Sequence, residues 1–277
     1  MKTVLEIIRL AEGYLKERKL PRARREAEDL VADVLGLRRL DLYVQFERPL
    51  VEKELNACRE ALKRRAAGEP LQYIAGKVEF AGVTIEVNRN VLIPRPETEI
   101  LIEMIASTLA KESLEGRVLL DLCAGSGYIG IALKKRFPAL EVILSDLSEE
   151  ALAVAQCNAE RNGVDVTILQ GDLVFRECDY FVSNPPYVTA EEWLNLDKSV
   201  RDFEPKMALI GGPSGLEFYI RIATVLKSYL KLGGKAWFEI GAGQGGPVKE
   251  IFQRAGWKNC TVESDWAGHD RFLCVFP

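Results

Sequence analysis

From residue 117 to the C-terminus, short apolar runs alternate with segments of helical periodicity. Two strands joined by a helix lie parallel in a right-handed crossover, so this alternation predicts a doubly wound α/β fold with a mainly parallel, Rossmann-like sheet covered on both faces. The last two runs are separated by a short loop and predict an antiparallel pair at the C-terminus. The seven expected strands are RVLLDL, EVILSD, VTILQGD, DYFVSN, KAWFEI, NCTVESD and RFLCVF, with helices beginning at Tyr128, Ser148, Gly215 and Pro247.

The N-terminal part follows different patterns. In residues 1–70 the apolar side chains recur every three or four positions, which predicts a small helical domain. Residues 71–94 contain KVEF and VTIEV on either side of Ala81-Gly82, which predicts a β-hairpin connector. Residues 95–277 form the α/β domain, and its first helix is expected to begin at Pro96 because the fixed φ of proline suits the first helical position.

The amino-acid composition restricts where in the cell the protein is expected and whether it can form a disulfide framework or a metal site. The 277-residue chain has no apolar run of membrane-spanning length, and charged residues interrupt its first segment, which therefore lacks a signal-peptide core. We expect a cytoplasmic protein without a membrane partner. The six cysteines show no Cys-x-x-Cys spacing and His269 is the single histidine, so neither a disulfide framework nor a metal site is expected.

Charge is divided unequally along the chain. Residues 1–70 carry a net charge of +3 and residues 71–277 carry −7, within an overall −4 and a pI near 5.4. A protein that binds nucleic acid directly usually presents a basic surface. We therefore expect no direct nucleic-acid partner for the acidic residues 71–277.

A glycine-rich turn follows the first predicted strand. That strand ends in Asp121, and the turn places Gly125, Gly127 and Gly130 as G-x-G-x-x-G, which brings a ligand against backbone N–H groups at a helix N-terminus. Asp146 closes the second strand at the spacing of an acid that binds ribose hydroxyls, and Asp172 closes the third. Each acid alone can cap the helix that follows it, but three at one sheet edge favour a ligand site.

Two adenosine cofactors suit this turn, a nicotinamide dinucleotide and S-adenosylmethionine. An acid beside the glycine turn disfavours the pyrophosphate of a dinucleotide. The same acid attracts the ammonium and sulfonium of S-adenosylmethionine. The position of Asp121 therefore favours the methyl donor.

The stretch SNPPY ends the fourth strand in a loop that is poor in backbone donors. Proline has no N–H, so Pro185 and Pro186 leave their neighbouring carbonyls without local partners. The Asn184 side-chain oxygen and the Pro185 carbonyl are placed to accept the two N–H bonds of a planar nitrogen. Asn-Pro is also ordinary turn chemistry at a strand end. A clamp on an amino or amide group serves methyl transfer and has no use in hydride transfer.

Five stretches together resemble one protein family. From about residue 70 onward the chain is similar to the HemK/PrmC protein-(glutamine-N5) methyltransferases, with the motifs in the same order and at similar spacing. NPPY alone is shared with DNA adenine and some RNA methyltransferases, whereas the first and fourth stretches are more specific. The stretches are VLIPRPETE, DLCAGSGYIG, SNPPY, EPKMALIGGPSGLEFY and EIGAGQ.

The resemblance implies S-adenosylmethionine as cofactor and peptide chain release factors as substrates, methylated on the side-chain nitrogen of the glutamine in their Gly-Gly-Gln loop. The implied catalytic clamp is Asn184, Pro185, Pro186 and Tyr187. Together with the acids inferred above, the expected cofactor-binding residues are Asp121, Cys123, Ala124, Gly125, Ser126, Gly127, Asp146, Asp172, Leu173 and Asn184. The family usually has glycine where this chain has Cys123, which raises the question of a positive φ at that position.

The chemistry of an amide explains the clamp. The amide lone pair is delocalised, so two acceptors that hold its N–H bonds would aim that lone pair at the methyl group and stabilise the developing positive charge. No strong base is required, because the methylated nitrogen loses its proton readily. Two alternatives stay open. A methyltransferase for adenine or guanine amino groups needs a basic groove and a stacking platform, and a nucleotide-binding module without catalysis leaves the clamp unexplained.

The helical domain carries none of the clamp or cofactor residues. A glutamine side chain alone is too small to identify one protein, so specificity requires contacts away from the reacting atom. We expect residues 1–70 to dock the body of the release factor.

Overall fold

The computed structural model describes residues 2–276. They form two compact units: a helical unit that ends at Gly76 and also includes Lys198–Phe203, and an α/β unit made of Lys77–Asp197 and the residues from Glu204 on. Within residues 2–276 every helix is too short or too polar to span a membrane. The same residues contain no cluster of histidine, cysteine and acidic side chains suited to a metal ion.

The helical unit is built around apolar faces that its helices turn toward one another. Thr3 starts the first helix with a capping box, in which its backbone N–H donates to Glu6 and its hydroxyl accepts from the Glu6 N–H. Gly36 ends the second with φ of +65°, a conformation that glycine adopts without strain. The helices are α1 (Val4–Glu17), α2 (Ala23–Leu35), α3 (Glu52–Ala66), α4 (Leu71–Ala75) and α9 (Lys198–Arg201), with a 3₁₀ turn at Arg39–Val44.

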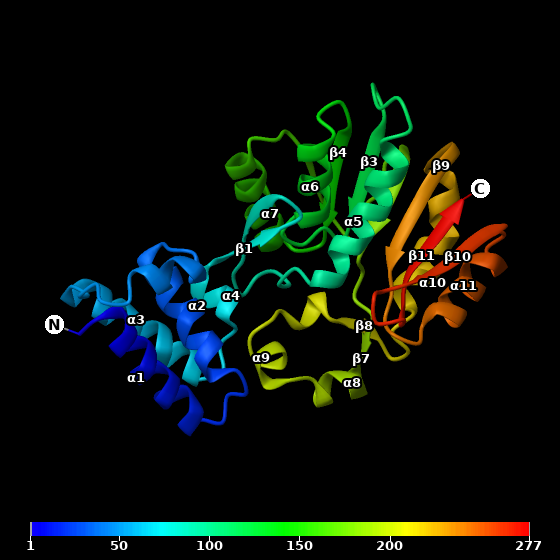
Figure 1. Ribbon diagram of the computed structural model, residues 1–277. Coiled ribbons are helices and arrows are strands. Elements are labelled where there is room, and N and C mark those ends of the chain that lie inside the picture. Colours follow the sequence, from blue (N-terminus) through cyan, green and yellow to red (C-terminus); the bar gives the residue numbers. More distant parts are fainter. Residues whose placement is uncertain (1, 277) are drawn as a thin grey trace. The chain divides into compact units, whose positions relative to one another are not determined.

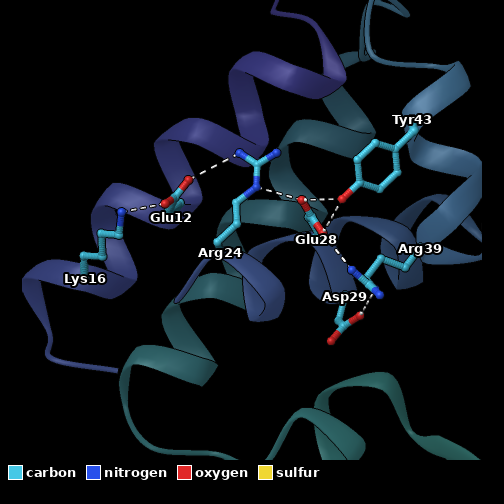
Figure 2. A network of polar contacts seen from close by, with 7 residues as sticks. All are labelled: Glu12, Lys16, Arg24, Glu28, Asp29, Arg39 and Tyr43. Carbon is cyan, nitrogen blue, oxygen red and sulfur yellow. Dashed lines mark hydrogen bonds and ion pairs between the residues drawn. The ribbon is translucent and has the colours of Figure 1, made fainter. Parts of the chain in front are cut away.

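A buried acid organises one side of this unit (Figure 2). Glu28 on α2 is only 3% exposed and accepts from Arg24 at 2.7 Å, from Arg39 at 3.1 Å and from the Tyr43 hydroxyl at 3.3 Å. Arg24 also reaches Glu12 on α1 at 3.3 Å. A buried carboxylate is tolerated when it is paired in this way, so the network joins α1, α2 and the 3₁₀ turn.

The α/β unit contains the seven-stranded sheet that the sequence predicted (Figure 1). Its strand order is β10-β11-β9-β6-β3-β4-β5. The five strands from β9 to β5 are parallel, whereas β11 runs antiparallel to both β9 and β10. The strands are β3 (Val118–Leu122), β4 (Glu141–Asp146), β5 (Thr167–Gln170), β6 (Cys178–Ser183), β9 (Leu230–Glu239), β10 (Asn259–Ser264) and β11 (Asp270–Phe276).

Helices cover both faces of the sheet, which confirms the doubly wound prediction. Alternate residues of β3 point to opposite faces: Leu120 and Leu122 join the apolar core that contains Tyr219 and Phe252, and Asp121 faces Gly130. The helices of this unit are α5 (Pro96–Leu109), α6 (Tyr128–Arg136), α7 (Glu149–Asn162), α8 (Ala190–Asn195), α10 (Glu217–Val225) and α11 (Gly245–Arg254), with 3₁₀ turns at Lys206–Ala208 and Leu226–Ser228. As expected, α5 begins at Pro96, but α10 begins two residues after Gly215 and α11 two residues before Pro247.

The expected hairpin is present as β1 (Lys77–Phe80) and β2 (Val83–Glu86), paired antiparallel. Two asparagines of α7 bind its open edge. Asn158 accepts from the Glu86 N–H at 2.7 Å and donates to its carbonyl at 3.1 Å, and Asn162 makes the equivalent pair with Thr84 at 3.2 and 2.8 Å. These side chains satisfy backbone groups that an edge strand leaves unpaired, so the hairpin packs on the α/β unit.

The segment between β6 and α10 contains structure that periodicity did not predict. A two-stranded parallel pair forms from β7 (Val188–Thr189) and β8 (Ile210–Gly212), and the short helices α8 and α9 lie between them in the sequence. These elements are too short to carry a periodic pattern. The first residues of the hairpin region likewise form the one-turn helix α4 and not an extended strand.

Candidate active site

A pocket lies at the carboxyl edge of the parallel sheet, where ligands bind in doubly wound folds. It encloses about 760 Å³ of space, including the part open to solvent. Its wall combines the glycine loop after β3, the ends of β4 and β5, the acceptor loop after β6 and residues near the 3₁₀ turn at Lys206–Ala208. Predicted site residues that line it are Cys123, Gly125, Asp146, Asp172, Leu173, Asn184 and Pro186.

Asp146 lies at the pocket wall at the end of β4. One carboxylate oxygen accepts from the Gly125 N–H at 2.8 Å and the other from the Ser148 N–H at 3.0 Å. Burial raises the pKa of this carboxyl, and the backbone N–H groups oppose that shift. Each oxygen retains a further lone pair, so Asp146 both shapes the glycine loop and offers acceptors to two neighbouring hydroxyls.

Asp121 differs from the sequence-based expectation. Its side chain is fully buried beneath the glycine loop and does not line the pocket. Oδ2 accepts from the Gly130 N–H at 2.9 Å, and no residue in the described chain donates a hydrogen bond to Oδ1. Burial raises the pKa of Asp121 to about 7, and the charge of Asp146 adds to the increase. An acid held in this state is poised to ionise when a cation binds nearby.

We expect Asp121→Asn to change the pH dependence of stability. The folded-state pKa near 7 exceeds the usual 3.8, so the wild type binds an extra proton when folded and loses stability as the pH rises through this window. Asparagine does not ionise. The free energy of unfolding of the variant, relative to wild type, should therefore increase between pH 5 and pH 8 by on the order of 2–4 kcal/mol.

Urea unfolding of the cofactor-free protein at both pH values measures this difference. Asp165→Asn, which removes an exposed carboxylate on a loop, is the matched control. The same offset at pH 5 and pH 8 for Asp121→Asn would show that the buried acid does not titrate in this range.

Two non-glycine residues that line the pocket have positive φ, one in the glycine loop and one after β5. Cys123 has φ of +60°, which answers the question raised by its substitution for glycine, and Leu173 after β5 has φ of +52°. Such conformations cost energy for residues with a Cβ and concentrate at functional sites. Gly130 is required for a different reason: a Cβ there would lie 2.4 Å from the Leu144 side chain and 3.1 Å from the carboxylate of Asp121.

The acceptor loop follows β6 directly. Asn184 Nδ2 donates to the Tyr128 hydroxyl at 3.0 Å, which turns its N–H side into the protein. Within residues 2–276 nothing donates a hydrogen bond to Asn184 Oδ1 or to the Pro185 carbonyl. Of these two acceptors, Asn184 lines the pocket, whereas Pro185 is buried and is not part of the lining. Tyr187 is partly buried and lies outside the pocket lining, and desolvation raises its pKa to about 12.

Two motifs later in the sequence, the glycine-rich stretch and EIGAGQ, contact the backbone of the acceptor loop. Gln244 Nε2 donates to the Tyr187 carbonyl at 3.1 Å, and Gln244 Oε1 accepts from the Gly241 N–H at 2.9 Å. A Cβ at Gly211 would lie 2.3 Å from the Pro186 carbonyl oxygen, and one at Gly215 would lie 2.2 Å from that of Tyr187. Only glycine permits this approach, so the glycine-rich stretch and EIGAGQ hold the acceptor loop in place.

Two other sequence motifs are joined by a partly buried ion pair. Arg95 of IPRPETE binds Glu204, the first residue of EPKMAL, at 2.5 Å. The second carboxylate oxygen of Glu204 accepts from the Ile93 N–H at 3.0 Å. Glu204 is 5% exposed, so this contact fixes the segment that leads to Pro205 and Met207 of the pocket wall.

Not every predicted residue contacts the pocket. Ala124, Ser126 and Gly127 form the body of the glycine loop behind its wall. Ala124 donates from its backbone to Ser145, Gly127 to Ala124, and the Ser126 carbonyl accepts from Asn158. Sequence reasoning did not assign several lining residues to the site. Val91, Tyr128, Met207 and Phe218 lie within the quoted stretches but were given no role, and Asn90 and Leu147 lie outside them.

The doubly wound seven-stranded sheet, the glycine loop above a buried acid and the acceptor loop at the next strand end together define a methyltransferase. The PrmC N-terminal domain family matches residues 6–76, and the methyltransferase small domain family matches residues 96–198. The chain belongs to the release factor glutamine methyltransferase family.

Close relatives cover nearly the whole chain. A release factor glutamine methyltransferase from Geobacter sulfurreducens is 40% identical over 98% of this chain and 95% of its own. One from Chlamydia trachomatis serovar L2 is 42% identical over 97% and 92%. The crystal structure of a methyltransferase from Pyrococcus furiosus, 20% identical, has a TM-score of 0.52 and covers 70% of this chain and 89% of that one, which agrees in fold.

Proposed function

We propose that this protein methylates the side-chain amide nitrogen (N5) of the glutamine in the Gly-Gly-Gln loop of peptide chain release factors, with S-adenosylmethionine as the methyl donor. Family membership supports the reaction class. The observation that carries the proposal is Asn184 at the pocket wall, with its N–H side bound to Tyr128 and its Oδ1 available. A cytoplasmic location fits a substrate that acts in translation.

The pocket suits S-adenosylmethionine. When bound, this cofactor supplies an electrophilic methyl group on a sulfonium. Asp146 would accept from the ribose hydroxyls, and Gly125, Cys123 and Leu173 would line the cofactor. The free Oδ1 of Asp121 lies in a buried carboxyl with a pKa near 7, which fits a site that receives positive charge. Asp172 is exposed at the rim and paired with Arg221 at 2.7 Å, so its contribution is the smallest of the three acids.

The acceptor loop would position the nucleophile. Asn184 Oδ1 and the Pro185 carbonyl would each accept one N–H of the substrate amide, which directs the nitrogen lone pair and stabilises the charge that develops on it. Rigid prolines hold these acceptors in advance of binding. Tyr187, whose carbonyl is held by Gln244, would pack on the amide plane. The proton of the methylated nitrogen is acidic and leaves without a dedicated base.

Incubation with labelled S-adenosylmethionine tests the proposal. Purified release factor should be labelled, and mass spectrometry should locate one added methyl group on the Gly-Gly-Gln glutamine. A release factor with that glutamine changed to alanine is the matched control and should stay unlabelled. Labelling of bulk RNA or DNA with no labelling of release factor would replace the proposal with an amino-group methyltransferase for nucleic acid.

We further propose that the helical unit, residues 1–70 in our expectation, docks the body of the release factor. A groove on this unit is lined by Lys16, Arg22, Arg24, Arg25 and Arg39 with two acids. Arg24 and Arg39 are held by the buried Glu28 (Figure 2). Arg22 and Arg25 are exposed, and within the described residues Arg22 has no ion-pair partner. Such a surface complements an acidic protein partner.

The double variant Arg22→Glu, Arg25→Glu should raise KM for intact release factor several-fold, because exposed charges steer encounter and contribute modestly to affinity. KM for a short Gly-Gly-Gln peptide should stay unchanged. Steady-state kinetics on both substrates, at low and high salt, measure the difference. The control is the double variant Arg254→Glu, Lys258→Glu, which reverses two positive charges on α11 and the loop that follows it. An equal increase in KM for release factor and for the peptide would contradict the docking role of the helical unit.

A further inference from the structure

A buried carboxylate lies behind the acceptor loop and has no role in the mechanism described so far. Glu239 ends β9 and is 1% exposed. Its Oε2 accepts from the Thr98 hydroxyl of α5 at 2.6 Å, across 141 positions of sequence. Asn184 lies close enough to lower the pKa of this carboxylate. A buried acid that lies beside the acceptor loop requires an explanation beyond packing.

Hydrogen-bond direction along this network can be followed from Glu239 outward. An ionised carboxylate only accepts, so the Thr98 hydroxyl must donate to it and leaves its lone pairs free. Tyr128 lies within hydrogen-bonding reach of Thr98. Because the Thr98 proton is used on Glu239, a hydrogen bond between the two hydroxyls requires Tyr128 to be the donor. The Tyr128 oxygen is then free to accept, and it accepts from Asn184 Nδ2 at 3.0 Å.

The Nδ2 side of the Asn184 amide therefore faces into the protein, where it donates to Tyr128 and lies near Glu239. Only the oxygen remains for the pocket. An asparagine amide can rotate by half a turn with little change in shape, and the reversed form would present donors to the substrate amide. The Asn184 amide is kept from rotating only while each group of the network keeps its role as hydrogen-bond donor or acceptor.

We propose that Glu239, acting through Thr98 and Tyr128, is a positioning residue that fixes the orientation of the Asn184 amide so that its oxygen faces the substrate. This inference rests on the proposed function for its kinetic consequences, but not for the orientation itself. A neutral group at position 239 can donate to Thr98, which allows Thr98 to donate to Tyr128 and Tyr128 to donate to Asn184 Oδ1. The chain would then hold the reversed amide.

The network has a pH dependence. Burial raises the pKa of Glu239 to about 7, opposed by the Thr98 hydrogen bond and by Arg271 of β11 and increased by Glu97 of α5. Tyr128 of α6, Tyr187 of the acceptor loop and Tyr219 of α10 also lie near this carboxylate. The productive amide orientation should therefore dominate above pH 7 and decrease below it. Asp121 has a similar pKa, but its ionisation would alter cofactor affinity and not turnover at saturating cofactor.

Kinetics at saturating substrates between pH 6 and pH 9 test the role. Glu239→Gln should lower kcat at pH 8 by roughly 10- to 100-fold, a loss of transition-state positioning, and remove the decrease in kcat near pH 7, with KM for both substrates changed by only a few-fold. Thr98→Val should lower kcat and move that decrease to higher pH, because Glu239 loses its donor. Thr98→Ser should restore both. Thr108→Val, a control on the same helix whose hydroxyl binds only the Met104 carbonyl, should resemble the wild type.

A second measurement needs no turnover. In ¹⁵N spectra the Asn184 side-chain N–H signals, assigned by their absence in Asn184→Ala, should exchange slowly with solvent at pH 8 and should become fast in Glu239→Gln and in Thr98→Val. If the wild type fails to methylate release factor while this protection holds, the proposed function is wrong and the positioning role stands. Unprotected Asn184 in the wild type, or wild-type kcat and pH profile in Glu239→Gln, would overturn the positioning role.

Discussion

Replacement of Asn184 by alanine should lower turnover by about 10²- to 10³-fold, the scale observed when one preorganised transition-state partner is removed. The side chain contributes an acceptor at the pocket wall and is fixed by Tyr128 at 3.0 Å. Alanine removes the acceptor and leaves the Pro185 carbonyl as the single remaining contact. Because the free energy is lost in the transition state, kcat should decrease while cofactor affinity changes by only a few-fold.

Single-turnover kinetics with release factor, combined with calorimetry of S-adenosylmethionine binding, separate these quantities. Asn195→Ala is a matched control on α8, where the asparagine side chain donates to the Glu191 carbonyl, and should retain normal turnover. If Asn184→Ala turned over at the wild-type rate, the Asn-Pro-Pro-Tyr loop would have no clamp function. If Asn184→Ala lowered only the affinity for S-adenosylmethionine, we would conclude that Asn184 contacts the cofactor and not the substrate.

The second large effect is expected for Asp146→Ala. Its carboxylate is the acceptor placed for the ribose hydroxyls, and hydrogen bonds to a charged group of this kind contribute about 1.5–3 kcal/mol, roughly a 10- to 150-fold change in Kd. The structure adds a second contribution, because Asp146 also accepts from the Gly125 and Ser148 N–H groups. Alanine leaves both donors unsatisfied beside the glycine loop, which places the expected loss toward the upper end.

Calorimetric titration with S-adenosylmethionine measures this effect directly. Asp146→Asn keeps one acceptor oxygen and the side-chain shape, so its Kd should lie between those of wild type and alanine variant. Asp172→Asn, at the exposed rim, should change Kd only slightly. An unchanged Kd for Asp146→Ala would show that the ribose binds elsewhere.

Local sequence chemistry accounts for most of the fold. The alternation of strands and helices, the start of α5 at Pro96 and the hairpin at Ala81-Gly82 depend on residues a few positions apart, and the structure confirms each of them. The segment from β7 to β8 was not predicted. Its elements contain two to six residues, and their formation depends on glycines that pack against the backbone of the acceptor loop.

The positive φ at Cys123 illustrates the limit of sequence reasoning at a single residue. The expectation of glycine at this position raised the question, but only the backbone shows that a cysteine occupies the left-handed region there. Asp121 illustrates the same limit for charge. The strand end placed it at the correct edge of the sheet, while its depth beneath the loop, and hence its pKa near 7, followed from packing of α6 against β3.

By itself, the sequence determined the doubly wound sheet, the glycine loop, the acid at Asp146 and the acceptor loop at Asn184, because periodicity, strand ends and proline chemistry are properties of neighbouring residues. Only the tertiary structure decided which groups support them. Thr98 and Glu239 are 141 positions apart and meet at 2.6 Å, and Gln244 reaches the Tyr187 carbonyl across 57 positions. Such contacts arise when helices pack on a sheet, and no local pattern records the distance between two buried side chains.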